Sequence, residues 1–150
     1  MARSSRPGGA LALDHGDKRT GFAYADALGI TLTPLEPFLG PGDSPALLER
    51  VAALCGELDV GRFVVGLPLH ADGSESARCA VVRAFAARLS ERFPDLEVEL
   101  VDEHLSSKAA EELLREAGYR ARESRARRDS WSALVLLRDW LAARERTRGN

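Results

Sequence analysis

The fold is decided by residues 10–25, which read Ala10-Leu11-Ala12-Leu13-Asp14-His15-Gly16-Asp17-Lys18-Arg19-Thr20-Gly21-Phe22-Ala23-Tyr24-Ala25. The apolar run that ends at Asp14 predicts a first buried strand. The polar residues after it predict a turn, because Gly16 allows a positive φ there. A second strand is predicted over roughly 20–25, so the chain opens with an antiparallel hairpin.

A third strand and a change of period follow this hairpin. Residues 30–38 predict a strand that Pro34 and Pro37 confine to the edge of a sheet, because proline has no N–H to donate to a neighbouring strand. Ser44-Pro45 then predicts a helix start, with serine as the N-cap and proline at the first helical position. The apolar residues after it recur with helical spacing on one face: Leu47, Leu48, Val51, Leu54, Cys55 and Leu58.

The remaining chain alternates between strands and helices. Strands are predicted over 62–66 and 96–103, with helices over 76–93, from Ser106 or Ser107 to Gly118, and over the amphipathic stretch 131–141. The order is β-β-β-α-β-α-β-α-α. It predicts an α/β fold with a mixed five-stranded sheet, first antiparallel and then parallel, and helices on both faces. The residues that we expect to point inward from helix 76–93 are Val81, Ala84, Phe85 and Leu89.

Composition bounds the class of protein. With 45% hydrophobic residues among 150, the chain suits a single domain, which we expect at 10–143 between a loose N-terminus at 1–9 and a tail at 144–150. The net charge of -2 does not by itself indicate nucleic-acid binding. We expect a cytoplasmic protein without a membrane span or signal peptide. Cys55 and Cys79 fall within apolar helical patterns and predict core thiols.

Three acidic positions lie where the predicted fold would bring them to one end of the sheet. Asp14 ends the first strand, Asp102 and Glu103 end the fifth, and Asp129 heads the last helix. Carboxylates at the ends of buried strands are costly unless a cation neutralises them. Because Mg²⁺ prefers a few carboxylate oxygens and keeps waters beside a phosphate substrate, the pattern indicates a metal site and metal-assisted hydrolysis.

Each acid also has a simpler interpretation. Asp14 could serve only the turn, whose backbone amides an aspartate caps. Asp102 and Glu103 could cap the following helix, and strand alternation lets only one of the two face a shared site. Asp129 could only offset the helix dipole. It nevertheless shares its helix face with three apolar residues: Ala133, Leu136 and Trp140.

An ordered set of short motifs is similar to one bacterial family. The motifs are Asp14-His15-Gly16-Asp17-Lys18-Arg19-Thr20-Gly21, Leu28-Gly29-Ile30, Val64-Val65-Gly66-Leu67-Pro68-Leu69, Asp72-Gly73-Ser74, Val101-Asp102-Glu103-His104-Leu105-Ser106-Ser107, and Asp129 followed by Ala133. Each motif is weak alone, whereas their order across nearly the whole chain is specific. Together they resemble the YqgF/RuvX family, whose members are named as pre-16S rRNA nucleases and, earlier, as Holliday junction resolvases.

The resemblance implies an RNase H-like fold and a nuclease that depends on Mg²⁺ or Mn²⁺. It carries Asp14, Glu103 and Asp129 over as an acidic triad that is both catalytic and metal-binding, with Asp102 as a reserve acid. It also implies a nucleic-acid substrate, RNA before DNA, with ribosomal precursor particles as partners. The residues expected to contact that substrate are Lys18, Arg19, His104, Arg125, Arg127 and Arg128.

The chain departs from the family pattern at three histidines. His15 stands where Tyr or Phe is usual, His70 where Asn is usual, and His104 where Arg is usual. Scattered singly in loops, they are expected to be exposed or bonded to the backbone rather than to bind metal. The departures leave two other functions open: resolution of four-way DNA junctions, and a non-catalytic module that binds nucleic acid or a protein. An actin-like phosphotransferase ranks last, because the chain lacks the second glycine loop that such an enzyme needs.

Overall fold

The computed structural model describes residues 8–103, 112, 116 and 121–148, with no side chains described for 121–129 and 148. Residues 1–7 of the expected loose N-terminus lie outside this part of the chain. So does nearly all of the third helix, which was predicted to end at Gly118.

The described elements follow the predicted order. The hairpin is formed by β1 (Gly9–Asp14) and β2 (Arg19–Ala25), and β3 (Leu32–Leu39) completes the meander. After it come α1 (Pro45–Glu57), β4 (Val60–Pro68), α2 (Ala77–Arg92), β5 (Glu97–Glu103) and α4 (Ala121–Arg148). The last helix α4 begins well before the amphipathic stretch at 131–141 and continues through 144–148. Within the described part of the chain, no helix has both the length and the apolar character needed to cross a membrane.

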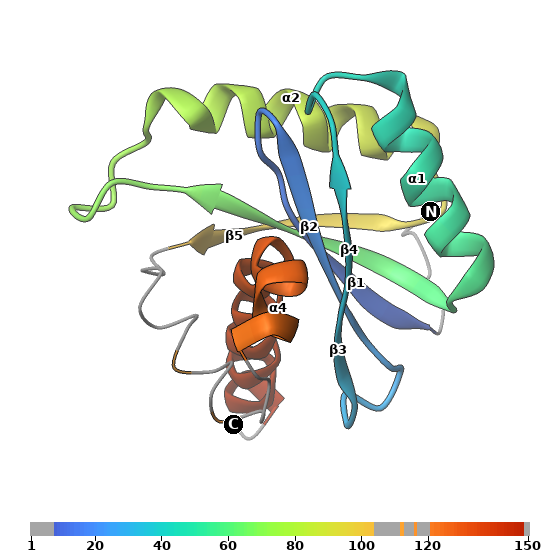
Figure 1. Ribbon diagram of the computed structural model, residues 1–150. Helices are drawn as coiled ribbons and strands as arrows, with labels where there is room; N and C mark the ends of the chain where they lie inside the picture. The colour runs from blue at the N-terminus through green and yellow to red at the C-terminus, as the bar shows by residue number, and fades with distance from the viewer. Residues whose placement is uncertain (1–7, 104–111, 113–115, 117–120, 149–150) are drawn as a thin grey trace.

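The five strands form one mixed sheet in the order β3-β2-β1-β4-β5. The β1–β2 and β2–β3 pairs are antiparallel, whereas β1–β4 and β4–β5 are parallel. The proline-bearing strand β3 lies at an edge, as its composition predicted. Figure 1 shows α1 and α2 over one face of the sheet and α4 over the other. The predicted α/β, RNase H-like architecture with both faces covered is therefore confirmed.

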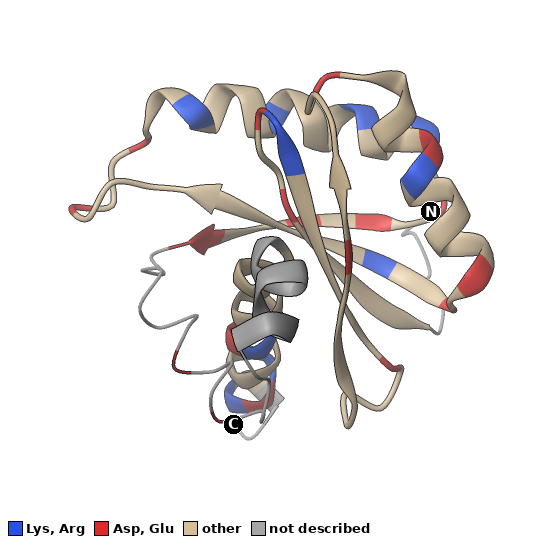
Figure 2. Ribbon diagram, in the orientation of Figure 1, with Lys and Arg blue, Asp and Glu red and all other residues tan. Residues whose placement is uncertain are grey.

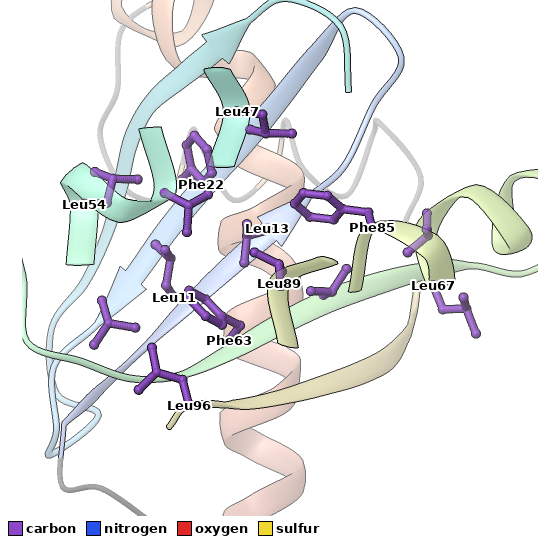
Figure 3. Packing of buried hydrophobic residues seen from close by; sticks show 14 of the residues in the cluster. Leu11, Leu13, Phe22, Leu47, Leu54, Phe63, Leu67, Phe85, Leu89 and Leu96 are labelled. Carbon is purple, nitrogen blue, oxygen red and sulfur yellow. The ribbon is translucent and has the colours of Figure 1, made fainter. Parts of the chain in front are cut away.

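Alternation along the strands divides the core into two layers. Leu11 and Leu13 of β1 pack toward α1 and α2, in the cluster drawn in Figure 3. The residues between them point the other way. On that face β1 and β2 present alanines, including Ala12 and Ala23, against large side chains of α4 such as Trp131. Small residues on the sheet let the bulky helix face pack closely, which fixes α4 over this surface.

The predicted inward face of α2 is partly wrong. Val81 is 42% exposed and Ala84 is exposed as well. The residues that α2 buries against the sheet are instead Val82, Phe85 and Leu89, which lie on one face of the helix at spacings of three and four residues. The strand β3 also starts later than predicted, at Leu32, since Ile30 lies between the preceding turn and the strand and is 76% exposed.

Candidate active site

Asp14 and Glu103 lie on the same face of the sheet, beneath α4. Ala12 belongs to the cluster against α4, so Asp14, two residues further along β1, faces that helix as well. Val101 packs against the same cluster, so Glu103 faces α4 by the same alternation. Because β1, β4 and β5 are mutually parallel, the ends that carry the two acids meet at one edge of the sheet.

Gly66 leaves the space in which the two acids approach. Gly66 belongs to β4, the strand between β1 and β5. Because Leu13 pairs with Val65, the next residues along these two strands are Asp14 and Gly66. A Cβ atom at Gly66 would lie 2.7 Å from Glu103 Oε2 and 3.2 Å from Leu136 Cδ2. Since real Cβ atoms do not approach an oxygen so closely, any side chain at this position would displace the Glu103 carboxyl group. A glycine inside a strand pattern marks such a close approach.

The electrostatics of Glu103 are strongly perturbed. Burial, and then the neighbouring Asp14 carboxylate, raise the pKa of Glu103 to about 8. Two carboxylates that share a site disfavour each other's ionised form. The pair therefore has to hold a proton or be neutralised by a cation. Oxygen ligands of this kind suit a hard divalent cation such as Mg²⁺, so the residues present fit the metal that the resemblance implies.

The reserve acid Asp102 points away from this pair. Leu100 and Val98, two and four residues before it, pack against the cluster under α1 and α2. Strand alternation therefore directs Asp102 toward that opposite face, where its register partner is Leu67 and its side chain is exposed.

Asp129 lies in α4, but its side chain is outside the described part of the structure. The residues predicted to share its helix face are all buried against the sheet: Ala133, Leu136 and Trp140. Among the side chains that are described, no group of three His, Cys, Asp or Glu residues could hold a metal ion. The full triad therefore stays a prediction, of which two members are seen together.

Ser130 fixes the position of α4 relative to the sheet, beside the predicted site. Its hydroxyl donates to the Leu35 carbonyl of β3 and accepts from the Phe22 amide of β2 at 3.2 Å. These strands meet here next to a β-bulge, where the β2–β3 register shifts between Thr20 and Phe22. A buried hydroxyl that completes an interrupted ladder locks the helix to the sheet one residue after Asp129. Sequence reasoning missed this contact, since a serine in a helix gives no such signal.

The predicted substrate-binding residues are only partly described. Lys18, at the end of the segment that joins β1 to β2, and Arg19, the first residue of β2, are both exposed. Arg19 lies two residues before Gly21, the register partner of Asp14, so it belongs to the same face of the sheet, the one that α4 covers. His104 lies outside the described residues. The remaining three have a described backbone within α4 but no described side chains: Arg125, Arg127 and Arg128.

His15 is a structural residue on the far side of the sheet from this site. It is 6% exposed, its Nε2 lies 2.8 Å from the Gly42 carbonyl, and its ring stacks on Phe85 with centroids 4.3 Å apart. Burial lowers the pKa of His15 below its usual range. His70 is exposed in the loop after β4. The expectation that these two histidines are exposed or bonded to the backbone is confirmed.

At the other end of the sheet face that α4 covers, the charged side chains have partners. Each partner is a group of opposite charge or a hydrogen-bond donor. Arg62 lies 3.4 Å from Glu97, and Trp140 Nε1 donates to Glu99 at 2.7 Å. The guanidinium groups of Arg62 and Arg144 lie over the Trp140 ring, 5.6 and 4.7 Å from its centroid. A hollow of about 220 Å³ opens beside this cluster.

Comparison with known proteins gives one family. The family described as "RuvX: Holliday junction resolvase" matches residues 8–143. A protein of Anaeromyxobacter sp. (strain Fw109-5), named "Putative pre-16S rRNA nuclease", is 46% identical over 134 residues, covering 89% of this chain and 96% of its own length. Proteins of the same name from Prosthecochloris aestuarii and Thermobifida fusca are 40% and 41% identical, and cover 85% and 95% of this chain and 88% and 92% of their own.

A solved structure is also similar in part. Archaeoglobus fulgidus Pelota, whose crystal structure is described as revealing inter-domain structural plasticity, matches 95% of this chain with a TM-score of 0.37 and 14% identity. The match spans 37% of that protein.

Proposed function

The chain belongs to the RuvX family, and on that premise we propose that it is a nuclease that hydrolyses phosphodiester bonds of precursor 16S rRNA in the cytoplasm. The observation that carries the proposal is the approach of Asp14 and Glu103 over Gly66, with the pKa of Glu103 raised to about 8. A strongly perturbed carboxyl group beside a second one is typical of functional sites rather than of surfaces optimised for stability.

We propose that Asp14 and Glu103 hold Mg²⁺ or Mn²⁺, with Asp129 as the third ligand from the start of α4. When bound, the ion would supply Lewis acidity at the scissile phosphate. Glu103 would have to lose its proton to bind the ion, whose positive charge would offset the repulsion between the Glu103 and Asp14 carboxylates. On the helix side, Leu136 Cδ2 lies 3.2 Å from where a Cβ atom of Gly66 would be, so an apolar side chain of α4 lies next to Gly66 as Glu103 does.

Basic residues would hold the nucleic-acid strand. Arg19 shares the sheet face of Asp14, and Lys18 directly precedes it. We propose that these two and the arginines near Asp129 contact phosphates, since arginine matches phosphate with paired N–H donors. Phosphate contacts position a strand without reading its sequence. The choice of precursor rRNA therefore rests on the names of the relatives, as does the proposed association with ribosomal precursor particles.

A second candidate substrate is the four-way DNA junction, which the description of the matching family favours. The acidic pair itself does not distinguish the two, because the same metal-assisted hydrolysis acts on either backbone. The substrates differ in the 2′-hydroxyl and in shape, which are read by contacts away from the reacting phosphate.

The test is a digestion with Mg²⁺ or Mn²⁺ of four substrates offered side by side: a precursor-rRNA fragment, single-stranded RNA, single-stranded DNA and a four-way junction. We expect the rRNA fragment to be cleaved fastest. Asp14→Asn should keep the fold, as measured by circular dichroism. Its cleavage rate should fall by more than the roughly 10–100-fold that is typical of changes outside the ligand shell. Asp102→Asn is the matched control on the opposite face and should cleave like the wild type.

Each outcome decides between the candidates. Fastest cleavage of the junction would favour the resolvase. Binding of nucleic acid without cleavage of any substrate would favour a non-catalytic module. Equal cleavage by the wild type and Asp14→Asn would exclude the acidic pair as the active site.

A further inference from the structure

Arg78, at the start of α2, binds the segment that follows Asp14. It forms an ion pair with Asp17, and its Nη2 donates to the backbone carbonyl of His15 at 2.9 Å. His15 is the residue directly after Asp14, and Asp17 lies in the same connection to β2. One guanidinium group therefore holds two points of the connection between β1 and β2.

The His15 ring extends this contact to a second loop. Because a carbonyl only accepts, His15 Nε2 donates to Gly42, and its Nδ1 then accepts from Arg78 Nη2 at 3.3 Å. The same loop is bonded directly to the connection, since the Gly42 amide donates to the Asp17 carbonyl at 3.1 Å. Arg78 thus belongs to a continuous chain of hydrogen bonds that joins α2, the connection after β1 and the loop at Gly42.

The other arginines of α2 reach different segments. Figure 2 shows basic residues spaced along this helix. Arg83 pairs with Glu75 in the loop before α2, and Arg92 pairs with Glu49 of α1 at 2.9 Å. Arg88 donates to the Asp43 carbonyl at 3.3 Å. These contacts fasten α2 to the rest of the fold, whereas the contacts of Arg78 end on the residue directly after Asp14 and on Asp17.

We propose that Arg78 is a positioning residue of the metal centre, which fixes the backbone after Asp14 so that its carboxylate faces Glu103. The inference rests on the proposed function, in which Asp14 binds the cation. The strand ladder ends at the pair of Asp14 with Gly21, so the direction of the Asp14 side chain depends on what holds the chain beyond it. Hydrogen bonds from a guanidinium group are about twice as strong as neutral ones.

A fixed connection matters because a loose one would have to be ordered when the cation binds. That ordering lowers affinity even when every ligand is present. Groups that orient metal ligands from outside the ligand shell typically change metal affinity by roughly 10–100-fold. The contacts of Arg78 act on Asp14 only through the backbone. We therefore expect the loss of metal affinity to lie near the lower end of this range, at about tenfold.

The experiment is a calorimetric titration of the full chain with Mn²⁺ in the absence of substrate. Arg78→Met keeps the aliphatic stem and removes the three polar contacts, and it should weaken Mn²⁺ binding about tenfold. Arg83→Met is the matched control, since it breaks one exposed ion pair of the same helix, and it should bind Mn²⁺ like the wild type. His15→Phe retains the stacking on Phe85 and the backbone carbonyl, so its affinity should lie between the two.

A second variant guards against unfolding. Arg78→Lys keeps the charge but replaces the planar fork with a single ammonium group, so it should weaken binding in the same direction while melting close to the wild type. Wild-type Mn²⁺ affinity in both Arg78 variants would overturn the inference, and so would an equal loss in Arg83→Met. Asp14→Asn separates the two proposals, because unchanged Mn²⁺ binding in that variant contradicts the proposed function whatever Arg78 does.

Discussion

The two ends of the sheet face that α4 covers hold their acidic side chains in opposite surroundings. At the start of β5, Glu97 lies 3.4 Å from Arg62, and Glu99 accepts a hydrogen bond from the Trp140 indole. At the end of the same strand, Glu103 lies beside Asp14 and over Gly66. The strand β5 thus carries three glutamates on one face. The first two lie beside complementary partners, and the last lies beside another carboxylate.

The difference separates structural charge from functional charge. Glu97 and Glu99 have partners of complementary charge or polarity, whereas burial and the neighbouring Asp14 carboxylate both disfavour the ionised form of Glu103. Such an arrangement lowers stability unless a cation is bound, so it persists where it serves a function. The surroundings of each acid, rather than the acid itself, distinguish the two ends.

The largest effect is expected from filling the space between the acids. Gly66→Ala would place a methyl group 2.7 Å from Glu103 Oε2, which forces the carboxyl group away from Asp14. We expect cleavage to fall by more than about 100-fold, whereas the free energy of unfolding should change little, because the atoms that must move are the ends of two flexible side chains. Initial cleavage rates and urea unfolding measure the two effects.

Gly56→Ala is the matched control for this substitution. Gly56 lies in α1, and a Cβ atom there would meet nothing within 4 Å. The helix should gain about 0.5–1 kcal/mol, with cleavage unchanged. If Gly66→Ala cleaved as fast as Gly56→Ala, the close approach of the two acids would have no bearing on activity.

The next effect is a pH dependence that belongs to Glu103. Its pKa is raised from 4.5 to about 8 in the folded chain, so between these values the folded state binds more protons than the unfolded state. Without metal, the free energy of unfolding should therefore fall as the pH rises from about 4.5 to about 8. Urea unfolding at intervals across this range measures the slope, and Glu103→Gln should remove its contribution.

Metal binding should show the reverse dependence. Because Glu103 must be deprotonated to bind a cation, the affinity for Mn²⁺ should rise by up to about tenfold per pH unit below the folded pKa. Saturating Mn²⁺ should offset the loss of stability at higher pH. A Mn²⁺ affinity that is constant between pH 6 and 8 would show that Glu103 does not bind the ion.

Part of this site follows from local sequence rules. The periods of the apolar residues are local, so the element order was predictable, and the prolines of β3 indicated its edge position. Alternation along β5 required that Asp102 and Glu103 face opposite ways. The choice between them needed the position of neighbouring elements, because Val101 and Leu100 are equally apolar and only packing decides which one faces α4.

The rest depends on registers between remote segments. The space at Gly66 exists because β4 lies between the strands that carry Asp14 and Glu103. The contacts of Ser130 and Arg78 join residues more than sixty positions apart, so no local pattern announces them. The wrong assignment of Val81 to the inward face of α2 has the same origin, since a helix with several apolar stripes is oriented by its neighbours.

The smallest effect is expected at the other end of the α4 face, where Glu97 faces Arg62. Glu97→Gln removes the charge that faces Arg62, but the Glu97 side chain is 53% exposed and water replaces much of the interaction. Exposed ion pairs contribute about 0–1 kcal/mol, and Arg62 keeps its position over the Trp140 ring. We therefore expect a change in unfolding free energy within that range and no change in Mn²⁺ affinity. A loss of Mn²⁺ affinity in Glu97→Gln would mean that the two ends of the α4 face are coupled, and that charge compensation at one end helps to hold the acidic pair at the other.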